Sequence, residues 1–219
     1  MSCVENYFAI RKELEQAGKG GVLLLPVSKT VEAPAIRELY DAGVRDFGEN
    51  RIEVLTPKAE ALPKDIRWHF IGRLQSNKVR KILKVAQVIH SVDSIELVER
   101  ISRIAGEEGV RPKVFLEISV SGEEQKGGFP VARAAELASA AAKAPNITLA
   151  GLMTMAPLDA DDAVCRKVFD GLRSCRDELE KALAVSLPEL SMGMSNDWPA
   201  AVACGSTLIR VGSAIFHRP

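Results

Sequence analysis

The sequence has no long apolar run and no excess charge of either sign. Its longest apolar stretch, residues 22–27, is far shorter than the roughly 20 residues that a membrane-spanning helix needs. The 29 Lys and Arg residues balance the 29 Asp and Glu residues, which argues against the dominant basic face of a nucleic-acid-binding protein. Residues 1–19 mix charged and apolar side chains and lack the apolar centre of a secretory signal. We therefore expect a cytoplasmic protein that binds neither membranes nor nucleic acid.

Cysteine and histidine are also scarce and scattered. The four cysteines form no C-x-x-C pair, and the three histidines show no spacing typical of metal ligands. Reduced thiols in the cytoplasm are the simplest interpretation, and we predict no metal site. With 47% hydrophobic residues, a chain of 219 residues can bury a full core without such crosslinks. No linker rich in Gly, Ser or Pro divides residues 1–219, so we expect a single domain.

Short apolar runs alternate with amphipathic stretches along almost the whole chain. Continuous apolar runs are typical of parallel strands that are buried on both faces. The stretches between them have the period of helices, as in 94–107, where Leu97, Ile101 and Ile104 share one face. We expect strands at 21–27, 44–47, 66–71, 86–90, 113–119, 147–152, 189–192 and 207–211, and helices at 4–17, 31–42, 50–61, 77–85, 94–107, 131–144, 160–184 and 197–203.

This alternation predicts an α/β protein of the (β/α)8 (TIM) barrel type, with an extra helix at the N-terminus. Eight strand–helix units in about 200 residues fit the small end of the barrel's size range. The alternative is an open, doubly wound sheet. Its usual Gly-rich dinucleotide fingerprint is missing, because 26–30 reads PVSKT after the first strand. In a barrel, the residues that follow each strand are the candidates for chemistry.

Two charged residues stand at unusual places in this scheme. Lys29 follows the first strand, where its stem would lie in the barrel mouth, partly shielded from water, and its amine could condense with an aldehyde to form a Schiff base. The alternative is a lysine that simply extends into solvent. Arg210 lies inside the last strand and needs a partner, either a carboxylate such as Glu117 or a ring nitrogen of a cofactor. Asn50 could offer its amide at the rim or cap a helix, and Met153 could pack on a flat ring or fill the core.

Small hydroxyl residues and glycines cluster around the last two strands. Exposed backbone N–H groups in such loops bind phosphate, and barrels often hold phosphate beyond strands seven and eight. Ordinary turn chemistry is the alternative. The candidate phosphate ligands are Ser195 after the seventh strand and Ser206, Thr207 and Gly212 around the eighth. A reactive lysine, an internal arginine and a phosphate cradle together indicate a pyridoxal-phosphate site.

Seven motifs occur in order over nearly the whole chain. They are VSKT at 27–30, FGEN at 47–50, WHFIGRLQSNK at 68–78, IHSVDS at 89–94, GLMTM at 151–155, LSMGMSNDW at 190–198 and GSTLIRVGSAIF at 205–216. Together they resemble the pyridoxal phosphate homeostasis proteins, barrel proteins related to the N-terminal domain of alanine racemase. The resemblance implies that pyridoxal 5'-phosphate (PLP) is bound covalently by Lys29, at its phosphate by Ser195, Ser206, Thr207 and Gly212, and at its ring by Asn50, Met153 and Arg210.

The resemblance implies a PLP carrier without strong catalytic turnover, which buffers the cofactor or delivers it to apo-enzymes. We expect it to be cytoplasmic and, since nothing in the sequence suggests a large apolar interface, a monomer. An arginine beside the pyridine nitrogen would keep that nitrogen unprotonated and make the ring a poorer electron sink. The alternative is a PLP-dependent amino-acid racemase. Racemases of the related fold use a second domain and a tyrosine base from a partner subunit. Here the only tyrosines, Tyr7 and Tyr40, are expected away from the strand ends, so the second base is missing.

Overall fold

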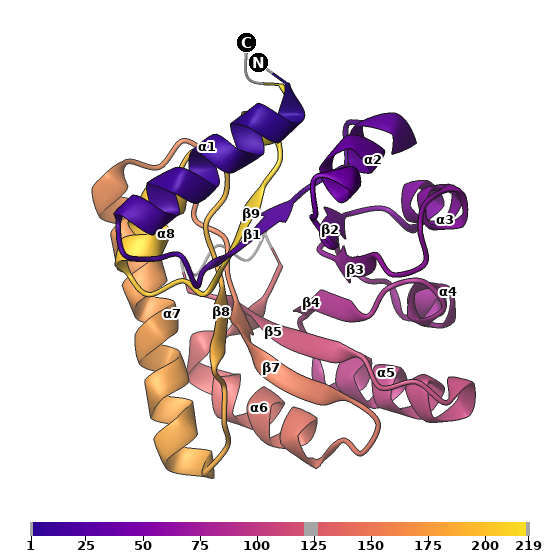
Figure 1. Ribbon diagram of the computed structural model, residues 1–219. Helices are drawn as coiled ribbons and strands as arrows, with labels where there is room; N and C mark the ends of the chain where they lie inside the picture. Colours follow the sequence, from indigo (N-terminus) through magenta and orange to yellow (C-terminus); the bar gives the residue numbers. More distant parts are fainter. Residues whose placement is uncertain (1, 121–126, 218–219) are drawn as a thin grey trace.

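Eight parallel strands form a ring, and helices cover its outside (Figure 1). The structure is a computed structural model that describes residues 2–120 and 127–217. The strands of the ring are β1 (Leu23–Pro26), β2 (Asp46–Glu49), β3 (Arg67–Phe70), β4 (Val88–Val92), β5 (Lys113–Ser119), β7 (Thr148–Met153), β8 (Glu189–Ser191) and β9 (Leu208–Val211). A short further strand, β6 (Phe129–Pro130), pairs with β5 outside the ring and was not predicted.

The strand order defines a closed barrel. Neighbouring strands follow the order β1-β9-β8-β7-β5-β4-β3-β2. The two ends of this series meet where Val27 pairs with Gly48 in a parallel bridge and the Ser28 backbone N–H donates to the Gly48 carbonyl at 2.9 Å. The predicted (β/α)8 barrel is confirmed. Because all the strands are parallel, their C-terminal ends meet at one end of the barrel, which we call the mouth, and their N-terminal ends at the other, which we call the base.

The helices fill the connections as the amphipathic pattern predicted, except that the short C-terminal helix α9 was not predicted. They are α1 (Cys3–Gln16), α2 (Ala33–Asp41), α3 (Ile52–Ala61), α4 (Val79–Leu83), α5 (Ile95–Glu108), α6 (Ala134–Lys143), α7 (Asp162–Leu183), α8 (Trp198–Ala203) and α9 (Ser213–Phe216), with 3-10 turns at Ser76–Lys78 and Val131–Arg133. The expected helix 77–85 is therefore shorter and starts with a 3-10 turn. The extra helix α1 packs against α2 and α9, where the Asn6 side-chain amide donates to the Ile215 carbonyl at 3.0 Å.

Two apolar layers result from the alternation of side chains along each strand. The larger layer lies between the strands and the helices and contains buried residues such as Phe47, Ile89 and Leu116. The smaller layer fills the barrel interior around Leu25 and Phe115. Since neighbouring residues in a strand face opposite sides, Phe47 points toward the helices while Asp46 and its counterparts point inward. The barrel interior therefore contains a few polar side chains, such as Asp46, among its apolar ones.

Within residues 2–120 and 127–217, no helix is long and apolar enough to cross a membrane. The same residues include no cluster of three or more His, Cys, Asp or Glu side chains that could hold a metal ion.

Candidate functional site

An open cavity of about 580 Å³ lies at the barrel mouth. Its walls come from the ends of several strands, and six residues predicted from the sequence are among them. These are Lys29, Asn50, Met153, Ser195, Arg210 and Gly212. They follow or end β1, β2, β7, β8 and β9, so only the parallel order of the barrel brings them together.

Lys29 stands at the edge of this cavity. It lines the cavity but is itself exposed, as is the neighbouring Thr30, whose hydroxyl lies 2.6 Å from His217 Nε2. We expected the lysine to be partly shielded from water. The structure corrects this. The chain stays buried for two residues beyond β1, as far as Ser28, and becomes exposed at Lys29. The amine is therefore open both to the cavity and to solvent.

A buried ion pair holds the backbone at the ends of two neighbouring strands, β1 and β2, at the mouth. The Lys58 amine lies 2.7 Å from the Glu49 carboxylate, and the two side chains are 4% and 0% exposed. Lys58 also donates to the Ser28 carbonyl at 2.8 Å, next to Lys29, and Glu49 accepts from the Asn50 backbone N–H at 3.0 Å. One pair thus holds the chain beside two candidate ligands, as supporting contacts commonly do around binding sites.

This supporting pair was missed in the sequence, although a signal for it exists. In α3, Ile52, Leu55 and Lys58 lie on the same buried face, three residues apart. A lysine at a position where the period calls for an apolar residue indicates a buried partner. That partner is Glu49, on the strand before the helix.

Within the described residues, Arg210 has no ionic partner and the Asn50 side-chain oxygen has no hydrogen-bond partner. Arg210 is 4% exposed and donates to Ser191 Oγ at 2.5 Å and to the Thr154 carbonyl at 2.9 Å. Among the described residues, no carboxylate forms an ion pair with it, so the suggested pairing with Glu117 is not observed. Burial lowers the pKa of Arg210 to about 10. The buried Asn50 Oδ1 has no hydrogen-bond partner within the described chain. A polar ligand in the cavity could give the Arg210 charge a partner and the Asn50 oxygen a hydrogen-bond donor.

The loop after β8 presents a hydroxyl beside Gly212. The Ser195 Oγ accepts from the backbone N–H groups of Gly212 at 3.3 Å and Ala214 at 3.4 Å. The chain turns toward this contact at Gly193, whose φ of +97° favours glycine, and an added Cβ there would lie 2.7 Å from the Ala201 Cβ. The glycine of the LSMGMSNDW motif is therefore needed to place Ser195 at the mouth.

Ser206 and Thr207 lie at the base, away from the other predicted residues. They precede β9, and a residue before a parallel strand lies at the end opposite the mouth. Ser206 Oγ donates to the Met192 carbonyl at 2.7 Å, and Thr207 Oγ1 accepts from the Leu190 backbone N–H at 2.8 Å. Both hydroxyls thus serve the contact between β8 and β9. The predicted grouping is corrected on this point, and neither residue belongs to the mouth cavity.

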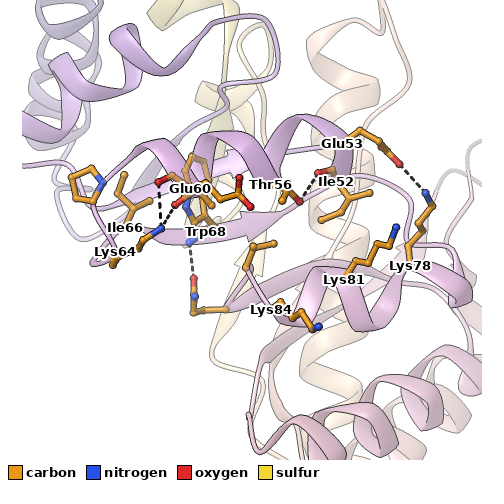
Figure 2. Close-up of a pocket in the computed structure, with 14 residues that line it drawn as sticks. Ile52, Glu53, Thr56, Glu60, Lys64, Ile66, Trp68, Lys78, Lys81 and Lys84 are labelled. Atoms are coloured by element: carbon orange, nitrogen blue, oxygen red, sulfur yellow. Dashed lines mark hydrogen bonds and ion pairs between the residues drawn. The ribbon is translucent and has the colours of Figure 1, made fainter.

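A second groove, of about 690 Å³, lies outside the barrel between α3 and α4 (Figure 2). Four lysines line it: Lys64, Lys78, Lys81 and Lys84. Lys78 pairs with Glu53 at 2.9 Å, and Lys64 donates to the Ala59 carbonyl at 2.8 Å. Since two of the four lysines are paired within the protein and the groove is remote from the C-terminal strand ends, the mouth cavity is the better candidate.

The comparisons with known proteins agree with this geometry. Residues 5–218 match the family model of the alanine racemase N-terminal domain, which gives the class of the protein. The pyridoxal phosphate homeostasis protein of Aquifex aeolicus is 41% identical over 94% of this chain and 92% of its own length. That of Pseudomonas aeruginosa is 42% identical, with 94% and 90% covered. The chain belongs to the pyridoxal phosphate homeostasis protein family, as the motifs indicated.

Solved structures extend the comparison. PipY of Synechococcus elongatus PCC7942 with PLP bound has a TM-score of 0.91 and 40% identity, with 98% of this chain and 100% of that chain covered. Alanine racemase of Clostridium difficile 630 has a TM-score of 0.80 but 18% identity, and the match covers 100% of this chain and 57% of the racemase. The racemase therefore shares the fold with this chain, over about half of its own length.

Proposed function

We propose that the protein binds PLP in the mouth cavity and serves intracellular PLP homeostasis, buffering or carrying the cofactor without strong catalytic turnover. The names of its relatives and the PLP-bound PipY support this function. The observation that carries it is the meeting, in one cavity, of the Lys29 amine, the buried Arg210 cation that has no carboxylate partner among the described residues, and the unpaired Asn50 oxygen. PLP supplies an aldehyde, an aromatic ring and a phosphate, and each has a counterpart there.

The residues of the cavity fit this group. The Lys29 amine is free to bond the aldehyde carbon, and the apolar Met153 is placed to contact the ring. Arg210 and Asn50 offer polar contacts to the ring substituents. Ser195 and Gly212 lie together, where the phosphate would be held. A volume of about 580 Å³ is ordinary for a small-ligand site. Because their hydroxyls are used at the base, we leave Ser206 and Thr207 out of the proposed site.

The racemase alternative has less support. Two-base racemisation needs a base on the face of the cofactor opposite the lysine. Tyr7 and Tyr40 lie on α1 and α2, and neither lines the cavity. The Tyr40 hydroxyl donates to Asp65 at 2.7 Å on the protein surface. These positions favour a carrier over a racemase.

We further propose that the chain forms one domain and acts as a monomer in the cytoplasm, delivering PLP to apo-enzymes. All four cysteines are free thiols, which supports a reducing compartment. In the part of the chain that the structure describes, the exposed large apolar side chains come from separate segments, which supports a monomer. They are Phe8, Val110, Val131, Leu158 and Val164.

Chemical trapping tests the assignment of Lys29. After incubation with PLP and reduction with borohydride, peptide mass spectrometry should find the added mass on the peptide that contains Lys29. Lys29→Ala should abolish this adduct, whereas Lys84→Ala, an exposed lysine of the outer groove, should leave it unchanged. An adduct on another lysine of the wild-type protein would refute the assignment.

Cofactor transfer tests the role as a carrier. The PLP-loaded protein should activate an apo-enzyme faster than an equal concentration of free PLP, or protect the cofactor better from competing amines. If it does neither, delivery is excluded and buffering alone remains. Racemisation of alanine or other amino acids at rates on the order of 1–10³ per second would instead establish the racemase.

A further inference from the structure

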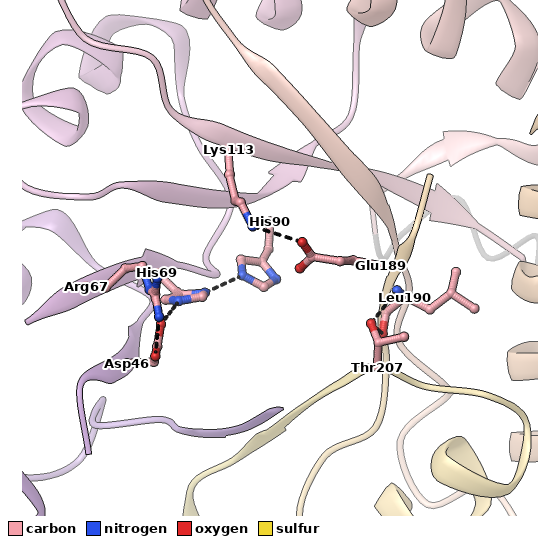
Figure 3. Close-up of polar contacts among 8 residues, drawn as sticks. All are labelled: Asp46, Arg67, His69, His90, Lys113, Glu189, Leu190 and Thr207. Atoms are coloured by element: carbon pink, nitrogen blue, oxygen red, sulfur yellow. Dashed lines mark hydrogen bonds and ion pairs between the residues drawn. The ribbon is translucent and has the colours of Figure 1, made fainter. Parts of the chain in front are cut away.

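A continuous line of hydrogen bonds crosses the barrel interior from the mouth to the base. Arg210 donates to Ser191 Oγ at 2.5 Å, and Ser191 Oγ lies 2.9 Å from His90 Nδ1. His90 Nε2 lies 3.0 Å from His69 Nδ1, and His69 Nε2 lies 2.9 Å from Asp46 Oδ1. All five residues are buried. Figure 3 shows the part of this line at the base, from His90 through His69 to Asp46.

The protonation states along this line follow from its two ends. Burial opposes the ionisation of Asp46, but hydrogen bonds from Arg67 and His69 outweigh it and hold the pKa of that carboxyl well below its usual range. Burial lowers the pKa of both His69 and His90, so both imidazoles are neutral near pH 7. A neutral imidazole donates from one nitrogen and accepts at the other.

One direction of donation satisfies every member of the line. An ionised Asp46 only accepts, so His69 donates to it from Nε2 and accepts at Nδ1. His90 therefore donates from Nε2 to His69 and accepts the Ser191 hydroxyl proton at Nδ1. The lone pairs of that hydroxyl are left for Arg210, which can only donate. Each donation makes the next acceptor stronger, as in other chains of hydrogen bonds at low dielectric.

We infer that Asp46, at the base, is a positioning residue for the site at the mouth: through His69, His90 and Ser191 it fixes the direction of the line and thereby orients Arg210. The part concerning PLP rests on the proposed function. Asp46 touches nothing in the cavity, so it acts only through the intervening side chains.

The surroundings favour positioning over simple filling of the core. The line crosses an apolar interior that includes Leu25, Val88 and Leu208, where a polar network is costly unless each member is satisfied. Phe115 stacks on His90, with ring centroids 4.4 Å apart and 18° between the planes, which fixes the imidazole plane. Of the line's two ends, only the Arg210 end lines the mouth cavity.

Imidazole ¹⁵N NMR of the ligand-free protein tests the direction of the line without any cofactor. Both buried histidines should be neutral with the proton on Nε2. In Asp46→Asn the amide can donate, so both should shift toward the Nδ1–H tautomer; Asp65→Asn, a surface carboxylate at 58% exposure, should change neither. A wild-type histidine that is charged or protonated on Nδ1 would overturn the inference. Unchanged tautomers in a folded Asp46→Leu variant, which offers His69 no acceptor, would do the same.

PLP titration, followed by absorption, tests the effect at the mouth. Ser191→Ala and Asp46→Asn should each shift the spectrum of bound PLP and weaken binding by roughly 3- to 10-fold, the value of about one hydrogen bond. Ser102→Ala, at a buried serine of α5 outside the line, should do neither. Normal spectrum and affinity in both folded variants would contradict the positioning role. If the wild-type protein fails to bind PLP, the proposed function fails, whereas the tautomer result still decides the direction of the line.

Two variants of His69, one that keeps the hydrogen bonds and one that removes them, keep the test decisive if Asp46→Asn does not fold. His69→Gln retains a donor for Asp46 and an acceptor for His90, so it should keep the wild-type spectrum and affinity. His69→Leu breaks the line and should change both. Equal behaviour of the two folded variants would show that shape, not hydrogen bonding, matters at this position.

Discussion

Each end of the barrel carries an arginine on one of its strands, but only the arginine at the base is paired with a carboxylate among the described residues. At the base, Arg67 donates two hydrogen bonds to Asp46, at 2.5 and 2.8 Å, and Lys113 forms an ion pair with Glu189 at 3.0 Å (Figure 3). At the mouth, Arg210 is buried with no carboxylate partner among the described residues. Cations paired with carboxylates within the protein contribute to folding, whereas a buried cation without such a partner is available to a ligand. The comparison thus separates structural from binding residues, and the predictions below test that separation.

Replacing one charged residue at each end should give the largest difference in the free energy of unfolding. Asp46→Ala leaves the buried His69 N–H without an acceptor and should lower the free energy of unfolding by roughly 2–4 kcal/mol. Arg210→Met removes a buried cation that has no anionic partner, keeps most of its volume, and should lower it by less than about 1 kcal/mol. Arg210→Met should instead weaken PLP binding by roughly tenfold or more.

Urea unfolding without PLP measures the first effect, and PLP titration measures the second. Equal losses of stability at the two ends would break the comparison. So would an Arg210→Met variant with unaltered PLP affinity.

The two ends also carry carboxyl groups whose pKa values move in opposite directions. On the mouth side, burial and then the charge of Asp93 raise the pKa of Glu117 from 4.5 to about 7. Between these values the folded protein keeps a proton that the unfolded chain releases, so the free energy of unfolding decreases as pH rises through this window. At the base, the lowered pKa of Asp46 has the opposite sign, and its contribution is lost as pH falls through the acid range.

Glu117→Gln should therefore remove the loss of stability between about pH 5 and pH 8, making the variant more stable by roughly 1–3 kcal/mol at pH 8. Urea unfolding at a series of pH values measures this. Glu136→Gln, which removes an exposed carboxylate on α6, should keep the wild-type pH profile. A wild-type profile in Glu117→Gln would show that Glu117 is ionised in the folded protein and that burial at the mouth has little effect on it.

Most of the fold could be read from the sequence because parallel strands buried on both faces leave continuous apolar runs. The second strand shows the limit of this signal. It was predicted at 44–47 but spans Asp46–Glu49, since its last residues are hidden by an ion pair rather than by apolar contacts. Hydropathy does not reveal a glutamate that is buried against a lysine nine residues later. The short β6, two residues long, has too little pattern to detect.

The site was less predictable than the fold. Residues that follow strands were located correctly at the mouth, but Ser206 and Thr207 precede a strand and were grouped with the wrong end. The line from Asp46 to Arg210 draws one side chain from each of five strands, β2, β3, β4, β8 and β9. All but Asp46 lie in motifs of the sequence, but the motifs do not show that these side chains contact one another. Only the register of the strands sets these side chains at matching heights in the barrel, and a single sequence does not state that register.

Two asparagines allow the finest test of the comparison, because each has a buried Oδ1 without a partner in the described chain. Asn6 lies on α1 and ties it to α9 through the Ile215 carbonyl, so Asn6→Ala should cost about 1 kcal/mol of unfolding free energy and leave PLP affinity unchanged. Asn50 lines the mouth, so Asn50→Ala should cost less than about 0.5 kcal/mol but weaken PLP binding roughly 2- to 5-fold. Urea unfolding and PLP titration of both variants give the four values. If Asn50→Ala binds PLP normally, an unpaired buried oxygen does not mark a ligand contact here, and the distinction between mouth and base then rests on Arg210.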